Sequence, residues 1–206
     1  MKLIQVRLKN FIDRVVAFFG LCVLFPLILI TGFFIKIGSP GPIFFKQKRV
    51  GKFEKSFYIY KFRSMYETKF SDGDVSEGIS AEEARSRYQT TIKNDPRITS
   101  TGVLIRKYFL DELPQLINVL KGEMSLVGPR PYTPSEIVDY SLSHWKQRHL
   151  VKPGITGLGQ VFHNGRNGKK YSRISLDLAY VKNQSFSLDI YILFYTFFRF
   201  FRGSSF

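Results

Sequence analysis

The sequence predicts an α+β fold: a mainly helical single domain with one small β-hairpin, an N-terminal membrane-embedded helical segment and a C-terminal interfacial helix. Three observations support this fold class. A long uncharged segment lies near the N-terminus, and two neighbouring runs rich in aromatic and branched residues are typical of paired strands. Apolar residues recur at helical spacing further along the chain. We therefore divide the chain into a membrane segment, residues 1–38, and a water-exposed domain, residues 39–206.

The chain is strongly basic. Its 206 residues include 31 lysines and arginines against 16 aspartates and glutamates, which gives a formal net charge of +15. Such a charge predicts anionic partners: nucleic acid, phosphorylated metabolites or acidic lipid headgroups. The single Cys22 excludes an intrachain disulfide, and the three histidines have no metal-ligand spacing. A reducing, cytoplasmic environment fits this composition.

The apolar part of the membrane segment is Val15–Ile35, VVAFFGLCVLFPLILITGFFI. It carries no charge over 21 residues, which is long enough for one span and too long for the apolar region of a cleavable signal peptide. Pro26 lies in the middle, where it removes the hydrogen bond to Cys22 and predicts a sharp bend. Basic residues flank both ends: Lys2, Arg7, Lys9 and Arg14 before, and Lys36, Lys46, Lys48 and Arg49 after.

Two topologies fit this segment. Positive charge at both ends favours keeping both ends in the cytoplasm. A limb of about 11 residues covers roughly 16 Å, which is about half of a ~30 Å hydrocarbon core. The first topology is therefore a re-entrant helix–break–helix that dips into one leaflet, with Pro26 at the break. The alternative is a plain kinked transmembrane anchor, which hydropathy also allows. We predict the re-entrant form.

The segments after the membrane region predict a hairpin followed by a surface excursion. Pro40-Gly41-Pro42 ends the membrane segment, and IFFKQKRVG and SFYIYKFRSM, on either side of residues 52–55, read as two strands. Residues 66–91 are polar and lack a persistent apolar period, so we expect a surface excursion with one short helix near Ala81–Tyr88. A second short helix should end near Arg106 or Lys107.

The stretch LDELPQLINVLKGEMSLVGPRP, Leu110–Pro131, predicts an amphipathic helix. Pro114 fits only a first turn, so the helix should begin at or just before Asp111, with Asp111 as N-cap and Glu112 in the first turn. The same position would also suit a phosphate, because free backbone N–H groups lie there. Lys121-Gly122 is an ordinary helix end. The predicted buried stripe is Leu113, Leu116, Ile117 and Leu120.

The last third of the chain predicts turns that alternate with helices. GPRP is a rigid turn that holds Arg130 between two prolines, and an arginine fixed in this way suits phosphate oxygens. Residues 133–149 should be helical, VKPGITGLGQV and HNGRNGKK should be loops, and Tyr171–Asn183 should be a helix that carries Asp177. Phe186–Phe201 is too short for a comfortable span; it predicts an interfacial helix or, alternatively, a helix packed into the protein's own core.

Four segments together resemble the monotopic phosphoglycosyl transferases, the bacterial sugar transferase family. They are KFRSM (Lys61–Met65), LDELPQLINVLKGEMSLVGPRP (Leu110–Pro131), VKPGITGLGQV (Val151–Val161) and NGRN (Asn164–Asn167). The resemblance covers nearly the whole chain, and DELPQ with GPRP at this spacing, followed by PGITG, is a highly specific combination. It is the minimal catalytic form that the chain resembles, since no multi-helix membrane domain precedes the motifs.

The resemblance implies transfer of a phosphosugar from a UDP-sugar to a polyprenol phosphate, typically undecaprenyl phosphate. The products would be polyprenyl-diphosphosugar and UMP. The reaction would be the first membrane step of O-antigen, capsule, exopolysaccharide or glycoprotein assembly, at the cytoplasmic face of the bacterial inner membrane. Residues 39–206 would then be a cytoplasmic catalytic domain with membrane-surface helices. Membrane lipids and downstream glycosyltransferases would be further partners.

The resemblance also assigns roles to residues. Asp111 would be the nucleophile, through a covalent enzyme–phosphosugar intermediate, and Glu112 the neighbouring functional carboxylate. Mg²⁺ would be the cofactor, with Asp111 as its ligand. Substrate and phosphate binding would fall to Lys61, Arg106, Arg130 and Asp177. Physically, a carboxylate attacks a diphosphate only when the phosphate charge is neutralised, which a metal ion and arginines supply.

Two alternatives differ from this reading. A basic membrane-bound module that binds nucleic acid or acidic lipid without catalysis would explain the charge and both apolar ends. It leaves Asp111-Glu112 and GPRP unexplained, and the sequence has no nucleic-acid motif, so we expect no nucleic-acid partner. A second alternative keeps the fold but has Glu112 assist a direct, single-displacement transfer. The identity of the sugar stays open.

Overall fold

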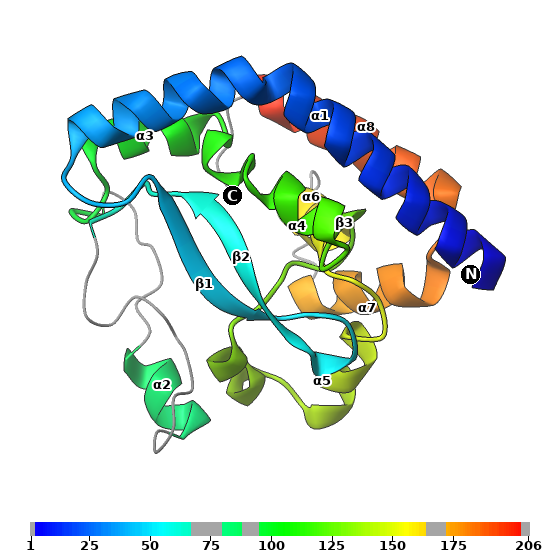
Figure 1. Cartoon of the computed structure of the whole chain (residues 1–206). Coiled ribbons are helices and arrows are strands. Elements are labelled where there is room, and N and C mark those ends of the chain that lie inside the picture. The colour runs from blue at the N-terminus through cyan, green and yellow to red at the C-terminus, as the bar shows by residue number, and fades with distance from the viewer. Residues whose placement is uncertain (1–2, 67–79, 88–94, 164–171, 203–206) are drawn as a thin grey trace.

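The computed structural model describes residues 3–66, 80–87, 95–163 and 172–202. Its elements confirm the mainly helical α+β fold, with a hairpin and a second small sheet (Figure 1). The helices are α1 (Leu3–Gly38), α2 (Ala81–Arg87), α3 (Ser100–Lys107), α4 (Gln115–Lys121), α5 (Leu142–Arg148), α6 (Leu158–Phe162), α7 (Arg173–Asn183) and α8 (Phe186–Arg202). The strands are β1 (Phe44–Val50), β2 (Ser56–Phe62), β3 (Ser125–Val127) and β4 (Gly154–Thr156), and the 3₁₀ turns are η1 (Lys52–Glu54), η2 (Leu110–Glu112) and η3 (Pro134–Asp139).

Helix α1 is one continuous helix that contains Pro26 and bends along its length (Figure 1). The proline therefore does not end the helix, because its neighbours keep helical geometry and only the local hydrogen bond is lost. Residues Ile4–Gly38 make the single stretch, within the described part of the chain, that is long and apolar enough to cross a membrane. Most of its length is exposed, including Phe11, Phe18 and Phe33.

The hairpin of β1 and β2 confirms the strand prediction. The two strands pair antiparallel, with Phe44 opposite Phe62 and Val50 opposite Ser56. Alternate residues of β2 are buried: Phe57 and Ile59 pack against Val119 of α4, so the hairpin and α4 share one core cluster. Phe62 packs against Ile35 of α1 in a neighbouring cluster. The hairpin thus connects the end of α1 to the centre of the domain.

The second sheet differs from the prediction of a loop over VKPGITGLGQV. Strand β4 lies parallel to β3, with Ser125 opposite Gly154 and Val127 opposite Thr156, and α6 follows directly. The region 133–149 is likewise not one helix: η3 ends at Asp139, and α5 begins after Ser141, whose side chain caps it. Tyr140 between them is extended and stacks on Tyr132, so core packing overrides the local helical preference.

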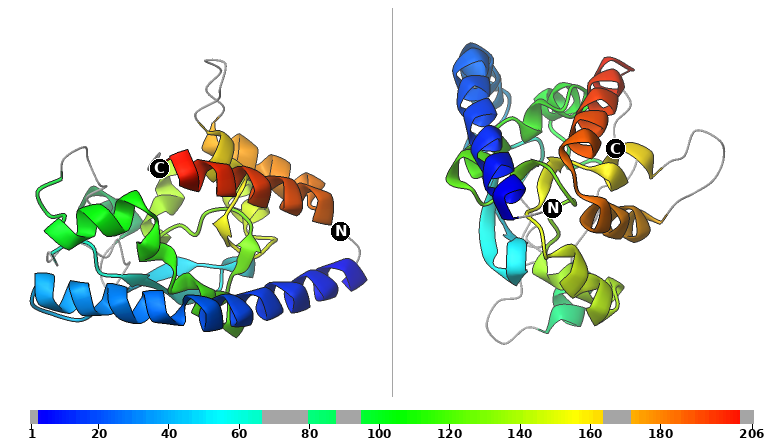
Figure 2. Two further views of the ribbon diagram at one scale, coloured as in Figure 1. Left: turned by 90° about the horizontal axis from the view of Figure 1, so that it is seen from above. Right: turned by 90° about the vertical axis from the view of Figure 1, so that its right-hand side faces the viewer.

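Helix α8, the C-terminal segment, has a buried face and an exposed face, so both alternatives for it describe part of the helix. Ile192 is fully buried, whereas Ile190, Phe194 and Phe197 on the opposite side are between 58 and 68% exposed. The helix therefore packs inward on one face and presents an apolar outer face. α1, α3 and α8 all lie on the upper side of the molecule in Figure 1, and the right-hand view of Figure 2 agrees with this placement. All three helices also carry exposed apolar residues, such as Phe18, Val103 and Phe194.

A buried polar cluster joins the beginnings of α1 and α8. Lys9 pairs with Asp189 at 2.8 Å and with Asp13 at 3.4 Å, and these three side chains are less than 10% exposed. Tyr180 donates to Asp189 at 2.7 Å, and Ser125 donates to Asp13 at 2.6 Å. Each buried charge thus has a charged or hydrogen-bonding partner, which the desolvation of an ionic group requires. The cluster fixes α8 relative to α1.

Candidate active site

Three of the predicted site residues, Lys61, Glu112 and Arg130, come from separate parts of the chain and line one pocket. Lys61 lies near the end of β2, Asp111 and Glu112 form η2, and Arg130 lies in the turn after β3. The pocket has an empty volume of about 240 Å³, including its open mouth. Its lining residues are Arg49, Ile59, Lys61, Glu112, Gln115, Arg130, Pro131, Gly154, Ile155 and Gln160.

The local structure of the Asp-Glu pair differs from the prediction. Phe109 adopts a left-handed conformation (φ 52°), which reverses the chain after α3 and starts the short turn η2. Pro114 then takes the N-cap position of α4, so the helix begins at Gln115. The prediction that Asp111 caps this helix is therefore wrong. Both carboxylates therefore precede the helix and are not part of its first turn, and Glu112 lines the pocket.

Glu112 is paired with Lys61. Lys61 Nζ lies 2.9 Å from Glu112 Oε1, and both side chains are less than one-fifth exposed. Burial by itself would raise the pKa of Glu112, but the charges of Lys61 and Arg130 outweigh it, and Lys61 and Gln115 donate hydrogen bonds. The net result is a pKa below the usual value, so Glu112 is ionised at neutral pH. Glu112 in turn fixes the Lys61 ammonium beside Asp111.

Asp111 has a different environment. Burial, together with the neighbouring charge of Glu112, raises its pKa, against the opposing charges of Lys61 and Arg106. Within the described residues its carboxylate has no ion-pair partner closer than 4 Å. Arg106 lies on α3, where its guanidinium contacts Met65 Sδ at 3.4 Å, and it contributes favourable charge to Asp111. A partly desolvated carboxylate surrounded by cations is suited to approach an anionic phosphate.

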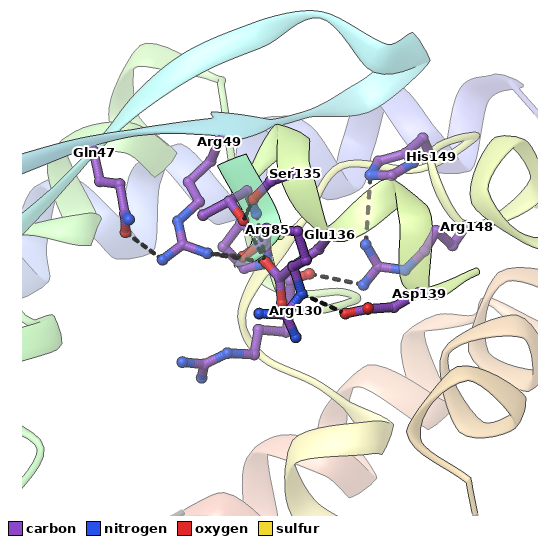
Figure 3. A network of polar contacts seen from close by, with 11 residues as sticks. Gln47, Arg49, Arg85, Arg130, Ser135, Glu136, Asp139, Arg148 and His149 are labelled. Carbon is purple, nitrogen blue, oxygen red and sulfur yellow. Dashed lines mark hydrogen bonds and ion pairs between the residues drawn. The ribbon is translucent and has the colours of Figure 1, made fainter. Parts of the chain in front are cut away.

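The turn that carries Arg130 is held by two buried arginines. Arg148 Nη2 donates to the carbonyl of Arg130 at 2.7 Å, and Arg49 Nη1 donates to the carbonyl of Pro131 at 3.1 Å (Figure 3). Arg148 is only 2% exposed, and Arg49 is 7% exposed. The side chain of Arg130 points away from this network in Figure 3. The backbone of the turn is therefore fixed while the guanidinium of Arg130 stays available to a ligand.

Asp177 contacts Arg148, one of the two arginines that hold this turn. Its carboxylate lies 2.8 Å from Arg148 Nη2, and both side chains are about 1% exposed. Burial raises the pKa of Asp177, against the opposing charge of Arg148. Arg148 also stacks on the Tyr132 ring, 3.8 Å from its centroid. Asp177 therefore contacts the arginine that holds the Arg130 turn, and it is absent from the residues that line the pocket.

Close backbone contact explains why GPRP and PGITG occur together. Gly128 donates to the Thr156 carbonyl and Gly154 donates to the Pro129 carbonyl, each at 2.9 Å. A Cβ on Gly154 would lie 2.0 Å from the backbone nitrogen of Gly128, and a Cβ on Gly128 would lie 2.4 Å from the Lys152 carbonyl. Only glycine allows the two segments to approach this closely. The contact places Gly154 and Ile155 in the wall of the pocket.

Sequence reasoning missed four residues that shape the site: Arg49, Gln115, Arg148 and Gln160. Gln115 and Gln160 lie inside the motifs DELPQ and VKPGITGLGQV, which is the signal that could have found them. Arg49 and Arg148 could not be told from surface arginines, because their partners are distant in sequence. Among the predicted residues, Lys61, Glu112 and Arg130 line the pocket, whereas Asp111, the neighbour of Glu112 in η2, is not one of its lining residues. Arg166 of NGRN lies outside the described residues.

Comparison with known proteins agrees with this geometry. The family described as bacterial sugar transferase matches residues 4–203. The chain belongs to the bacterial sugar transferase family. The match extends from α1 to α8, so the long apolar helix α1, the pocket and the C-terminal helix α8 all lie within the matched region.

Several relatives of this bacterial sugar transferase are about 40% identical to it. The exopolysaccharide production protein PSS of Rhizobium leguminosarum bv. phaseoli is 40% identical, with 92% of each chain covered. The uncharacterized sugar transferase EpsL of Bacillus subtilis is 42% identical over 90% of this chain and 83% of EpsL. The UDP-glucose:undecaprenyl-phosphate glucose-1-phosphate transferase of Xanthomonas campestris pv. campestris is 42% identical over 88% of this chain, which spans only 36% of that protein.

The site of this sugar transferase could hold a magnesium ion only if substrate phosphates and water supplied most of the metal's ligands. Among the described residues, no three Asp, Glu, His or Cys side chains gather into a group that could hold a metal. Mg²⁺ is commonly bound by one or two carboxylates together with substrate phosphates and water. The unpaired Asp111 carboxylate supplies one such ligand, whereas Glu112 is already neutralised by Lys61.

Proposed function

We propose that this protein transfers a phosphosugar from a UDP-sugar to undecaprenyl phosphate and releases UMP. The observation that carries the proposal is the pocket in which Glu112, Lys61 and Arg130 lie together next to the unpaired carboxylate of Asp111. The names of two relatives support the substrates, because each is an undecaprenyl-phosphate transferase that uses a UDP-sugar. A further relative is named for exopolysaccharide production, which supports a role at the start of polysaccharide assembly.

The proposed reaction proceeds in two displacements at Asp111. In the first, an oxygen of the Asp111 carboxylate forms a bond to the sugar-bound phosphorus of the UDP-sugar. The bond from that phosphorus to the bridging oxygen breaks, and UMP leaves with the electron pair. In the second, a phosphate oxygen of undecaprenyl phosphate attacks the same phosphorus and Asp111 leaves as a carboxylate. Covalent catalysis lets the soluble nucleotide depart before the lipid acceptor reacts.

The other residues supply charge where the phosphates require it. Arg130 presents a guanidinium fork to phosphate oxygens, and its fixed backbone limits the entropy lost on binding. Lys61, paired with Glu112, lines the pocket, and Arg106 adds positive charge near Asp111. Mg²⁺, when bound at Asp111, would neutralise part of the negative charge that repels the attacking carboxylate. Glu112 fixes Lys61 in place, so it acts on the reaction through this lysine.

The membrane arrangement is part of the proposal. We propose that α1 enters one leaflet and returns at its bend, so that both ends lie on the cytoplasmic side of the inner membrane. Basic residues at both ends support this topology. Helices α3 and α8 lie on the same side of the molecule as α1, and their exposed apolar residues Val103, Leu104, Phe194 and Phe197 would rest in the interface. Arg63 donates to the carbonyls of Ser39 and Pro40, which ties the end of α1 to the strand of Lys61.

The activity is tested with purified protein, Mg²⁺ and undecaprenyl phosphate against a panel of UDP-sugars, scored by UMP release. We expect UMP release with at least one donor, and its loss in Asp111→Asn. If the folded protein binds anionic vesicles but releases no UMP with any donor, the non-catalytic basic module would be favoured instead.

The topology is tested separately by labelling single cysteines placed at positions 2 and 46, in a chain whose Cys22 is replaced by serine. Both positions should be labelled only after the cells are opened. Labelling of either position in intact cells would instead support a crossing helix.

A further inference from the structure

Gln160 is a buried pocket residue whose polar groups are only partly used. Its side chain is 4% exposed, and its Nε2 donates to the Ile155 carbonyl at 2.9 Å. Arg199 of α8 donates to the backbone carbonyl of Gln160 at 2.7 Å, which fixes the residue from the other side. Gln160 lines the same pocket as Glu112, Lys61 and Arg130. The amide is therefore held in one orientation at the pocket wall.

The Oε1 atom of this amide has no hydrogen-bond partner among the described residues, although it is buried. A buried polar atom without a partner is costly, so such atoms in native proteins are satisfied by water or by a ligand. Rotating the amide does not remove the problem, since it would place the oxygen against the Ile155 carbonyl. Oε1 is thus a fixed acceptor for which the described residues supply no donor, so it is open to water or a ligand.

The chemistry of an amide oxygen limits what it can bind. It accepts hydrogen bonds and cannot donate them, so it would not contact an ionised phosphate oxygen. In the proposed reaction the groups that carry suitable O–H or N–H donors are the sugar and the uridine of the UDP-sugar. Undecaprenyl phosphate has only its phosphate to offer at this end. The sugar is bonded directly to the reacting phosphate, whereas the uracil is separated from it by a ribose and a second phosphate, so a pocket beside Asp111 favours the sugar.

On the basis of the proposed function, we propose that Gln160 is a donor-binding residue whose Oε1 accepts a hydrogen bond from one hydroxyl group of the transferred sugar. Gln160 then contributes to the choice of sugar, because a site built around a hydrogen bond rejects an analogue that lacks the group. The contact persists after UMP leaves, since the sugar stays attached through its phosphate to Asp111.

The test compares Gln160→Met with the wild type. Methionine keeps the unbranched shape of glutamine and removes both polar atoms. Each protein is assayed with the best UDP-sugar and with its series of monodeoxy analogues, at saturating undecaprenyl phosphate. Melting temperature and UDP-sugar binding are measured on the same samples, so a loss of folded protein is separated from a loss of contact. Gln147→Leu, on the exposed side of α5, is the matched control.

We expect Gln160→Met to lower kcat/KM for the hydroxylated donor about tenfold, mainly through KM. With the wild type, one deoxy analogue should show a kcat/KM about as low as that of the variant with the hydroxylated donor. With the variant, the same analogue should show no further decrease in kcat/KM, because the hydrogen-bonding hydroxyl group is already absent. Unchanged kcat/KM in Gln160→Met for every donor would overturn the inference and indicate a water at Oε1.

The remaining outcomes separate the sources of the contact. Gln160→Met could raise the inhibition constant for UMP while no deoxy analogue lowers the kcat/KM of the wild type to the same extent as the substitution. That result would assign the contact to uridine and overturn the sugar assignment. Absence of UMP release by the wild type with every UDP-sugar would overturn the proposed function, and the inference with it.

Discussion

Arg148→Lys tests whether the buried arginine positions Arg130. Arg148 Nη2 donates to the Arg130 carbonyl at 2.7 Å and contacts Asp177 Oδ2 at 2.8 Å. Lysine keeps the positive charge that Asp177 requires, but its single ammonium on a flexible stem cannot reproduce the planar fork or the stacking on Tyr132. Loss of one or two charge-assisted hydrogen bonds predicts a decrease in the free energy of unfolding of about 2–4 kcal/mol.

The same substitution should lower turnover per folded molecule about tenfold, since a displaced Arg130 would lose roughly one charge-assisted contact to the phosphate. Chemical denaturation in detergent micelles and UMP release, measured on the same preparation, give the two values. Arg85→Lys is the control, because Arg85 pairs with Asp139 at 2.9 Å in a more exposed setting where an ion pair contributes little. Normal stability together with normal turnover in Arg148→Lys would refute the positioning role.

Two further substitutions test Arg130 in the pocket and the buried His149. Arg130→Lys should lower the transfer rate about ten- to hundredfold with little change in melting temperature; lowered stability with unchanged turnover would instead make Arg130 structural. His149 is held neutral: burial, and then the charge of Arg148, lower its pKa from 6.5 to about 4. The free energy of unfolding is therefore unaffected by His149 protonation above pH 6.5. It falls by about 3 kcal/mol as the pH drops towards 4, because only the unfolded chain binds the proton in this range. In denaturation at a series of pH values, His149→Gln should flatten this loss, and the exposed His144→Gln should not. Equal slopes in both variants would contradict the assignment.

The sequence predicted elements whose patterns are local. The alternation in β1 and β2 and the helical spacing before Asn183 and Phe201 require no knowledge of distant residues, and these elements were found within a few positions. Strands β3 and β4 were not predicted, because each has three residues and exists only through pairing across Ser125–Gly154 and Val127–Thr156. The start of α4 was misplaced because the left-handed Phe109 is a property of the folded chain.

The sequence motifs predicted several residues of the site, but they did not predict the contacts that these residues make. Lys61, Glu112 and Arg130 do line one pocket. The role expected for Asp177 was substrate binding, and its observed neighbour is the buried Arg148, 29 positions earlier in the chain. No sequence pattern distinguishes a buried arginine from an exposed one, since the difference lies in which partner the fold supplies. Gln160 is a similar case, because its unpartnered oxygen follows from three-dimensional packing.

The most direct test of the central claim is a search for the covalent intermediate on Asp111. Purified protein is incubated with Mg²⁺ and a UDP-sugar labelled in the sugar, without undecaprenyl phosphate, and both UMP and labelled peptide are measured. The two-displacement mechanism predicts release of UMP up to about one equivalent per protein in the first turnover, with the phosphosugar attached to the peptide that contains Asp111. Asp111→Asn should remain folded and give neither product. Release of UMP only after undecaprenyl phosphate is added, or a label on a different residue, would contradict the two-displacement mechanism.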